Sequence, residues 1–556
     1  MDSLIKTPGK KVFGKKRTLM FLNLNISCIA TSMLGTALTT SLPPILRDLK
    51  VSVDTGQWLT SGFGLFLAIM TPFTGYLISR FKTKRLYCIA IAFFIIGLTI
   101  CAFSRSIYIM MIGRIIQGCG NGLLSSMGQV IILTVYPPDR IGTMMGWYGL
   151  SMGVAPILAP TIAGILVDTV GWRMIFVIAI AIMTISFIFA IFVFEDVLPT
   201  MRKKFDFISL IISALAFGGV TFAIGNMGTH EFVSYHVLFS LIVGVVSGII
   251  FTYRQLHLKV PFLDVRIMKN KDYSVSLAAT VILNLILMGT AIVFPVYVQN
   301  IKGHSATISG LNALPGSLAM AIISPFAGRI YDKIGMKLLF IIGSVVSTAS
   351  NLSIYFIPYK MSIWYVGFIG ILRMASIGAL LMPLVTWAMK DVPKVKASDA
   401  TALFNSIRFI GGACGSALFI SIMTKIANTL GKNKEHPDMY GFNFVALIMG
   451  VFSFICLLLG LFGCKHTVKK TKTEENTEDM IKQDNKLEMR TKDQPDVEIV
   501  VGNKENENTG SESETVIENE ISIDELSINK EKYENETVLD NEIGKETTIN
   551  KVNSNN

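Results

Sequence analysis

The chain has 556 residues, of which 51% are hydrophobic and only 16% are charged. A soluble protein carries about a quarter charged residues, so the composition argues against a soluble globular chain. Lys and Arg outnumber Asp and Glu by 50 to 39, which gives a net charge of +11. These basic residues lie in short loops between apolar runs, where they set membrane topology, and we expect no nucleic-acid partner.

The apolar residues form runs of about 20, the length at which a helix crosses a hydrocarbon core about 30 Å thick. Backbone groups inside lipid must bond within their own segment, so each run is predicted to be a helix. Fourteen spans are predicted in chain order, at residues 19–41, 58–79, 86–104, 107–129, 141–167, 172–194, 208–227, 237–256, 275–300, 309–331, 337–357, 361–389, 397–427 and 440–463. The first run continues past Pro43 without a small-residue cleavage site, which favours an uncleaved span over a signal peptide.

An even number of spans places both ends of the chain on one side of the membrane. The loops rich in Lys and Arg, including residues 80–85, 202–204 and 390–396, all fall on that side. By the positive-inside rule, both termini are predicted to be cytoplasmic in a multi-pass protein of the cell membrane.

The composition changes after Cys464. Residues 465–556 are rich in Glu, Asn, Lys, Asp, Ser and Thr, with hardly any aromatic side chains. Such a segment buries too little apolar area to offset its ordering entropy. We predict a disordered cytoplasmic tail, which is either a solvated extension or an acidic segment that binds a partner.

Two pairs of distant stretches are alike. Gly122–Pro137 matches Gly378–Pro393 at an offset of 256 residues, and Gly75–Arg85 matches Gly328–Lys337 at an offset of 253. Many transporters build a midplane site from repeated halves, although chance similarity between apolar helices is the alternative. The predicted organisation is a cytoplasmic arm (1–17), a six-helix bundle (18–200), two extra helices with linkers (201–272), a second six-helix bundle (273–464) and the tail (465–556).

The two matched loops are predicted to form a conformational gate. Glycine permits close helix approach, and basic side chains can bond helix ends and acidic partners. Ordinary charge that sets topology is the alternative explanation. The predicted gate residues are Gly75, Arg80, Lys84, Arg85, Gly328, Asp332, Lys333 and Gly335.

The fourth span carries one polar stripe. Its polar residues recur at intervals of three or four, at Arg114, Gln117, Asn121, Ser125 and Gln129. A polar stripe on a membrane helix should face protein or water, although Arg114 lies near enough to the helix end to snorkel. A substrate cavity or coupling site is predicted at Arg114, Gln117, Asn121, Arg373, Asn405 and Arg408.

Arg373 and Arg408 lie about a dozen residues from the starts of their spans, roughly 16–18 Å into the membrane. A charge at that depth is expensive and usually functional. No Asp, Glu or His lies in the middle of any predicted span. The substrate is therefore hypothesised to be anionic or amphiphilic, such as a fatty acid, a lipid or an acidic drug. The alternative is that these arginines bond neighbouring carbonyl groups and leave the cavity neutral.

Several segments resemble motifs of the major facilitator superfamily. The fifth span reads GVAPILAPTIAG from Gly153 to Gly164 and resembles the antiporter motif in its doubled G-P form. Pro156 and Pro160 cannot donate helix hydrogen bonds, so a purely structural kink is the alternative. The loop at Gly75 resembles the family's loop signature, and the fourth and thirteenth spans resemble its arginine-containing motifs. In the first span, Leu34 stands where the family has an acid, so the resemblance leaves the proton carrier unassigned.

Over residues 15–465 the chain thus resembles a fourteen-helix drug:proton antiporter of the EmrB/QacA type. The resemblance implies an all-α polytopic fold and a monomeric secondary active transporter, which exports small molecules in exchange for protons by alternating access. Export or flipping of anionic amphiphiles is one alternative, and a non-transporting membrane sensor is another. The seven cysteines show no C-x-x-C pair, and no catalytic cluster or P-loop stands out. We expect no metal, no cofactor and no enzymatic activity.

Overall fold

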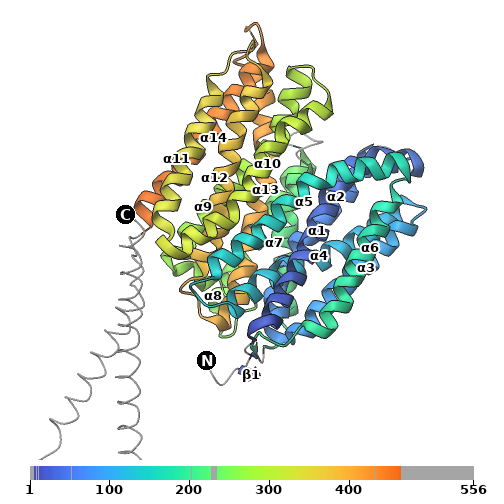
Figure 1. The fold of residues 1–556 in the computed structure, drawn as a ribbon, viewed down its shortest axis with the longest axis vertical. Coiled ribbons are helices and arrows are strands. Elements are labelled where there is room, and N and C mark those ends of the chain that lie inside the picture. Colours follow the sequence, from blue (N-terminus) through green and yellow to red (C-terminus); the bar gives the residue numbers. More distant parts are fainter. Residues whose placement is uncertain are drawn as a thin grey trace, which may run out of the picture. The chain divides into compact units, whose positions relative to one another are not determined.

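The computed structural model describes residues 5–7, 9–10, 12–51, 53–201, 203–226, 234–432 and 434–464. The predicted tail, residues 465–556, lies outside the described residues. Within the described chain, fourteen α-helices follow one another, joined by short connections (Figure 1). They are α1 (Gly14–Leu49), α2 (Val53–Arg80), α3 (Thr83–Phe103), α4 (Ile107–Val135), α5 (Ile141–Thr169), α6 (Arg173–Val193), α7 (Phe207–Asn226), α8 (Tyr235–His257), α9 (Lys271–Val296), α10 (Ala306–Ile334), α11 (Met336–Tyr355), α12 (Ile363–Met389), α13 (Ala397–Asn428) and α14 (Pro437–Gly463).

Each observed helix contains most of one predicted span, so the predicted all-α, polytopic fold is confirmed. Helices such as α1, α2, α4 and α10 extend beyond the predicted ends, because hydropathy marks only the part of a helix that lies in hydrocarbon, whereas α6 and α12 lie within their predicted spans. In the described residues, thirteen helices are long and apolar enough to cross a membrane, and α5 is not among them. Large apolar side chains such as Phe192, Ile249 and Phe368 are exposed on the outside of the bundle, as lipid contact requires.

The first six helices and the last six share one pattern of neighbours. In the first group α3 packs against α4 and α6, α2 against α4, and α1 against α5 and α6. In the second group α11 packs against α12 and α14, α10 against α12, and α9 against α13 and α14. Figure 1 shows these groups as the blue-to-teal helices α1–α6 and the yellow-green-to-orange helices α9–α14.

The two groups meet along two matching seams, where α5 contacts α10 and α2 contacts α13. The α5–α10 seam is especially tight. A Cβ atom on Gly328 would lie 2.2 Å from the carbonyl oxygen of Gly142, and one on Gly146 would lie 2.5 Å from that of Ser324. Glycine at these positions therefore lets the two backbones touch.

The two extra helices, α7 and α8, pack against each other as a hairpin. Gly219 and Gly244 form their crossing point, since a Cβ on Gly219 would lie 2.9 Å from the Cα of Gly244. The hairpin also touches α2 and α13, so it lies beside one of the two seams. A short strand β1 (Ile5–Thr7) pairs antiparallel with β2 (Thr200–Met201) in the α6–α7 linker.

Candidate functional site

The described helices surround a cavity of about 650 Å³, within the range of pockets that take drug-sized molecules. Its walls come from α5 of the first group and from α9, α10, α12 and α13 of the second group. The lining is mostly apolar or small, and its polar residues are Asn284, Thr290, Asn312, Ser317, Ser324, Arg373 and Arg408. No acidic side chain of the described chain lines this cavity. Its wall therefore carries positive charge without a carboxylate.

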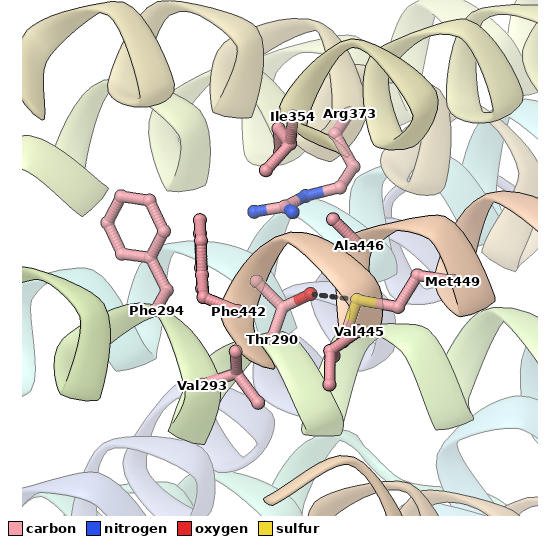
Figure 2. A pocket seen from close by; sticks show the side chains of 9 residues that line it. All are labelled: Thr290, Val293, Phe294, Ile354, Arg373, Phe442, Val445, Ala446 and Met449. Atoms are coloured by element: carbon pink, nitrogen blue, oxygen red, sulfur yellow. Dashed lines mark hydrogen bonds between the residues drawn. The ribbon is translucent and has the colours of Figure 1, made fainter. Parts of the chain in front are cut away.

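Arg373 on α12 and Arg408 on α13 supply that charge. The two residues are only 5% and 4% exposed. The Nε atom of each guanidinium has no hydrogen-bond partner among the described residues, and no described carboxylate pairs with either one. Figure 2 shows the guanidinium of Arg373 between Ile354, Phe442 and Thr290, in a crevice of about 10 Å³ that shares part of its lining with the main cavity.

The position of Arg408 follows from close packing between α13 and α9. A Cβ on Gly415 would lie 2.1 Å from the carbonyl oxygen of Leu285, and one on Gly411 would lie 2.7 Å from a methyl carbon of Val281. These glycines press α13 against α9. Arg408 lies within one turn of Gly411 and Gly412, at the point where the helix pair borders the cavity.

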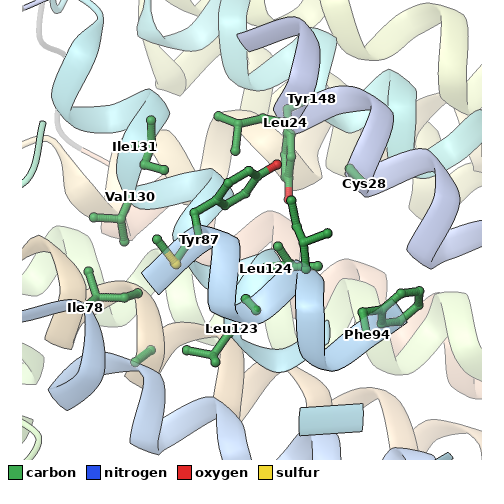
Figure 3. Packing of buried hydrophobic residues seen from close by; sticks show 14 of the residues in the cluster. Leu24, Cys28, Ile78, Tyr87, Phe94, Leu123, Leu124, Val130, Ile131 and Tyr148 are labelled. Carbon is green, nitrogen blue, oxygen red and sulfur yellow. The ribbon is translucent and has the colours of Figure 1, made fainter. Parts of the chain in front are cut away.

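Among the described residues of the first group, only α5 lines the cavity, and buried side chains pack behind it. Tyr148 of α5 is 2% exposed and lies in the core of the first group, beside Cys28 and close to Tyr87 and Leu124 (Figure 3). The Tyr87 hydroxyl is hydrogen-bonded to Ser27 at 2.8 Å. The cavity is thus built mainly on the second group, which sequence reasoning did not foresee.

Arg114 is buried within the first group and does not line the cavity. Its Nε donates to the carbonyl oxygen of Leu59 at 3.1 Å, and one terminal nitrogen donates to Oε1 of Gln117 at 2.7 Å. The guanidinium carbon lies 4.3 Å from the ring centroid of Phe63, a cation–π contact. With 1% exposure, Arg114 does not snorkel to the membrane surface. Its charge is held by three partners inside the α2–α4 pair.

Two further predicted cavity residues also lie away from the lining. Asn405 on α13 donates to Oε1 of Gln129 on α4 at 3.0 Å, which joins the two helix groups by a buried hydrogen bond. Asn121 is half-buried on α4. The roles predicted for Arg114, Gln117, Asn121 and Asn405 stay predictions.

One predicted gate residue forms a contact between the groups. Asp332, near the end of α10, accepts hydrogen bonds from the backbone nitrogens of Gly142 at 2.9 Å and Thr143 at 2.6 Å, and from the Thr143 hydroxyl at 2.7 Å. A carboxylate at the first turn of α5 satisfies free N–H groups and complements the helix dipole. We call this contact the Asp332 latch, and the end of the bundle where it lies the loop end.

The other seam carries a different contact at the loop end. The repeat aligns Ser79 of α2 with Asp332, and the Ser79 hydroxyl only donates to the carbonyl oxygen of Tyr76 at 2.9 Å. The acid is instead Asp399 in the first turn of α13, which accepts from Nζ of Lys203 at 2.7 Å. Both side chains are 6% exposed. We call this buried ion pair the Asp399 latch.

Glycine and a second ion pair surround the Asp399 latch. A Cβ on Gly75 would lie 3.1 Å from the Cβ of Ala402 and 3.4 Å from the Cα of Asp399, so α2 passes close to α13 here. Next to this contact, Nζ of Lys396 lies 2.7 Å from a carboxylate oxygen of Asp264.

The remaining gate residues are placed as follows. Arg80, Arg85 and Lys333 are exposed, and none forms an ion pair or side-chain hydrogen bond within the described chain. The backbone N–H of Lys84 donates a hydrogen bond to Oδ1 of Asp196 at 3.1 Å, so an acid just beyond α6 caps the start of α3. Gly335 has φ +87°, a conformation that favours glycine, between α10 and α11.

The antiporter-type segment lies in the middle of α5. Gly153 lines the cavity, and a Cβ there would lie 3.3 Å from Ala321 of α10. No such contact surrounds Gly164 within 4 Å. The side chains of Pro156 and Pro160 lie outside the described residues.

Sequence reasoning missed several polar residues of this region. Asn284 and Asn312 line the cavity from α9 and α10. Asn284 lies in the middle of an apolar run, a signal that would have found it, whereas Asn312 lies near the start of its span, where an amide is less conspicuous. Lys203 offered no such signal, because it lies in a linker where a lysine is ordinary.

Repeated helix groups around a central cavity define the class: an integral membrane protein built as a transporter. The sequence profile of the Major Facilitator Superfamily matches residues 20–416. The chain belongs to the Major Facilitator Superfamily and is a multi-pass membrane transporter, as its motifs predicted.

Bacterial transporters are similar to the chain over most of their length. A curated relative, the MFS-type transporter YcnB of Bacillus subtilis, is 31% identical over 75% of this chain and 89% of its own length. The lincomycin resistance protein LmrB of Listeria monocytogenes is 32% identical over 70% of this chain and 83% of its own. The multidrug export protein EmrB of Haemophilus influenzae is 26% identical over 73% and 80%.

Among solved structures, the proton:xylose symporter XylE matches with a TM-score of 0.56 and 12% identity, over 79% of this chain and 96% of its own. At this identity the likeness concerns the fold alone.

Proposed function

We propose that the protein exports small drug-like molecules across the cell membrane in exchange for protons. The observation that carries the proposal is the cavity of about 650 Å³ with residues of both helix groups in its wall. Its apolar lining suits amphiphilic molecules, and its volume suits one drug-sized molecule. Relatives named for lincomycin resistance and multidrug export support the same direction of transport.

Alternating access is the mechanism that we propose. The two six-helix bundles, residues 18–200 and 273–464, rock about the cavity, and the loop end opens when the Asp332 and Asp399 latches separate. The basic loops favour a cytoplasmic position for the loop end and for both termini. The two contacts between the groups at this end support a state in which the cavity is closed toward the cytoplasm.

We propose a proton carrier outside the cavity wall, since no described carboxylate lines that wall. Asp399 and Asp332 are the acids that join the groups. We therefore place proton exchange at the latches or within the first group. We regard the protein as a monomer whose substrate is amphiphilic. Two buried arginines without a described carboxylate partner favour anionic amphiphiles as a second candidate substrate class.

The test is transport by purified full-length protein in proteoliposomes with an imposed pH gradient. A panel of labelled drugs should accumulate only when the gradient is present. Ala313 lines the cavity with an exposed side chain, so Ala313→Trp should fill the cavity and abolish accumulation. Ala181, exposed on the outside of α6, provides the matched control, and Ala181→Trp should transport normally. Accumulation that ignores the gradient, or that survives Ala313→Trp, contradicts the proposal.

A further inference from the structure

We propose that the cavity selects amphiphiles with one negatively charged head group, such as a carboxylate, and holds that group through Arg373 and Arg408. This inference rests on the proposed function, because it names the substrate class of the same cavity. The apolar body of the molecule would lie against the rest of the lining.

The first step concerns charge. Arg373 and Arg408 line the same cavity, and guanidinium groups stay protonated at any physiological pH. Each is at least nine-tenths buried, and each leaves its Nε without a hydrogen-bond partner in the described chain. The guanidinium carbon of Arg408 lies 5.1 Å from the ring centroid of Phe409, but no described carboxylate pairs with either arginine. A buried charge without a counter-charge is unfavourable, so an anion that enters the cavity relieves that cost.

The second step is a comparison with Arg114, which the described chain surrounds with partners. Arg114 has a carbonyl, an amide and an aromatic face as partners. The repeat aligns Arg373 with Gln117 and Gly370 with Arg114. At the position of Gln117, which accepts the hydrogen bond from Arg114, the second group has the guanidinium of Arg373. At the position of Arg114 itself, the second group has Gly370, so no side chain of this helix stands there.

The third step concerns space. Gly370 lines the cavity, and no neighbouring atom of the described residues lies within 4 Å of the position that its Cβ would occupy. The missing side chain therefore leaves room one helical turn from Arg373, in the place that the first group fills with its own arginine. A ligand head group can occupy that room and approach the guanidinium.

The fourth step concerns the remainder of the ligand. Met288, Phe294, Met374 and Met382 contribute to an apolar lining around the two arginines. Methionine side chains adapt to different shapes, which suits bodies of variable structure better than one rigid substrate. Charge at one end of the ligand and apolar surface at the other match the cavity as a whole.

The experiment measures binding to purified full-length protein in nanodiscs with three probes that share one apolar body. These are 6-phenylhexanoate, 6-phenylhexanol and 6-phenylhexyltrimethylammonium. We expect the carboxylate to bind at least about tenfold more tightly than the alcohol, and the cation more weakly than either. Arg373→Gln and Arg408→Gln should each remove most of the carboxylate preference while the Kd of the alcohol stays the same.

Arg105 is exposed in the α3–α4 connection, and Arg105→Gln is the matched control that should keep the full preference. If a glutamine variant does not fold, Arg373→Lys and Arg408→Lys keep the charge and should keep a preference for the carboxylate. Equal Kd values for the three probes in the wild-type protein overturn the inference, as does a preference that survives both glutamine variants. If drugs are exported in the vesicle assay but the protein shows no preference for the carboxylate, this inference is wrong and the proposed function stands. If the carboxylate is preferred but no drug is exported, the proposed function is wrong and the anion site stands.

Discussion

At the loop end, the two seams join the helix groups through acidic residues that lie at different positions. At the α5–α10 seam, Asp332 reaches across from α10 and accepts three hydrogen bonds from the first turn of α5. At the α2–α13 seam, the aligned position is Ser79, and the acid Asp399 lies on the receiving helix itself. The buried carboxylate of Asp399 needs a cation to balance its charge, and Lys203 of the α6–α7 linker supplies it.

The difference shows that the acid can lie on either helix of a seam while the helix groups stay in contact. An acid in the first turn of α13 complements the dipole of its own helix, and a buried lysine then balances its charge. A motif that lacks its acid at Ser79 therefore does not indicate a missing contact between the groups. It indicates that the partner must be sought on the other side of the seam.

The largest effect is expected from breaking the Asp399 latch. Lys203→Met leaves a buried carboxylate without its cation, which costs about 3–5 kcal/mol. The thermal midpoint should fall, and spin-label distances between α2 and α13 at the loop end should lengthen. Asp399→Asn in the same chain should restore most of the loss, because it removes the unpaired charge. Lys204 is exposed, so Lys204→Met should change nothing, and equal behaviour of the two lysine variants would contradict the latch.

Removing the acid of the other seam should have a smaller effect. Asp332→Ala loses hydrogen bonds to a charged acceptor that is only partly buried, for which about 1.5–3 kcal/mol is typical. Spin-label distances between α5 and α10 should lengthen while those between α2 and α13 stay the same. Asp391 is exposed just beyond α12, and Asp391→Ala serves as the control. A change of both seams together would show that the two latches are not independent.

The glycines of the two seams should respond differently to the same substitution. In Gly328→Ala the new Cβ would lie 2.2 Å from a backbone oxygen, so α10 must move away from α5, at about 1–3 kcal/mol. In Gly75→Ala the nearest atom is a side-chain carbon at 3.1 Å, which a small adjustment accommodates. Thermal midpoints of the two variants measure the contrast. A larger loss for Gly75→Ala would reverse our ranking of the seams.

The sequence predicted the helices well because lipid forces apolar runs into helices, and neighbouring helices do not alter that rule. It also singled out Arg373 and Arg408, since a charge deep in an apolar run is conspicuous, and both line the cavity. The stripe of Arg114 gave an equally strong signal, yet its charge is satisfied inside the first group. Two of its three partners, Leu59 and Phe63, lie on the adjacent helix α2, which the pattern of one helix does not contain.

The smallest effect concerns how the linker that carries Lys203 is anchored. Glu195, at the end of α6, is paired with Lys16 of α1. The hydrogen bond from Lys16 holds the pKa of the Glu195 carboxyl below its ordinary value of 4.5. Because the folded protein favours the ionised form, this contribution to stability is present above pH 4.5 and disappears as the pH falls through the lowered folded-state pKa.

Glu195→Gln should therefore lower the thermal midpoint slightly at pH 7, by an amount that corresponds to about 0.2–1 kcal/mol for a partly exposed pair. The difference from the wild type should shrink as the pH falls below 4.5, and differential scanning calorimetry over that pH range measures it. The change should affect the α2–α13 seam, because the α6–α7 linker supplies the lysine of that latch, whereas the hydrogen bonds described for Asp332 come from α5. A shift of the α5–α10 distances in this variant would show that the anchoring of the linker also controls the other seam.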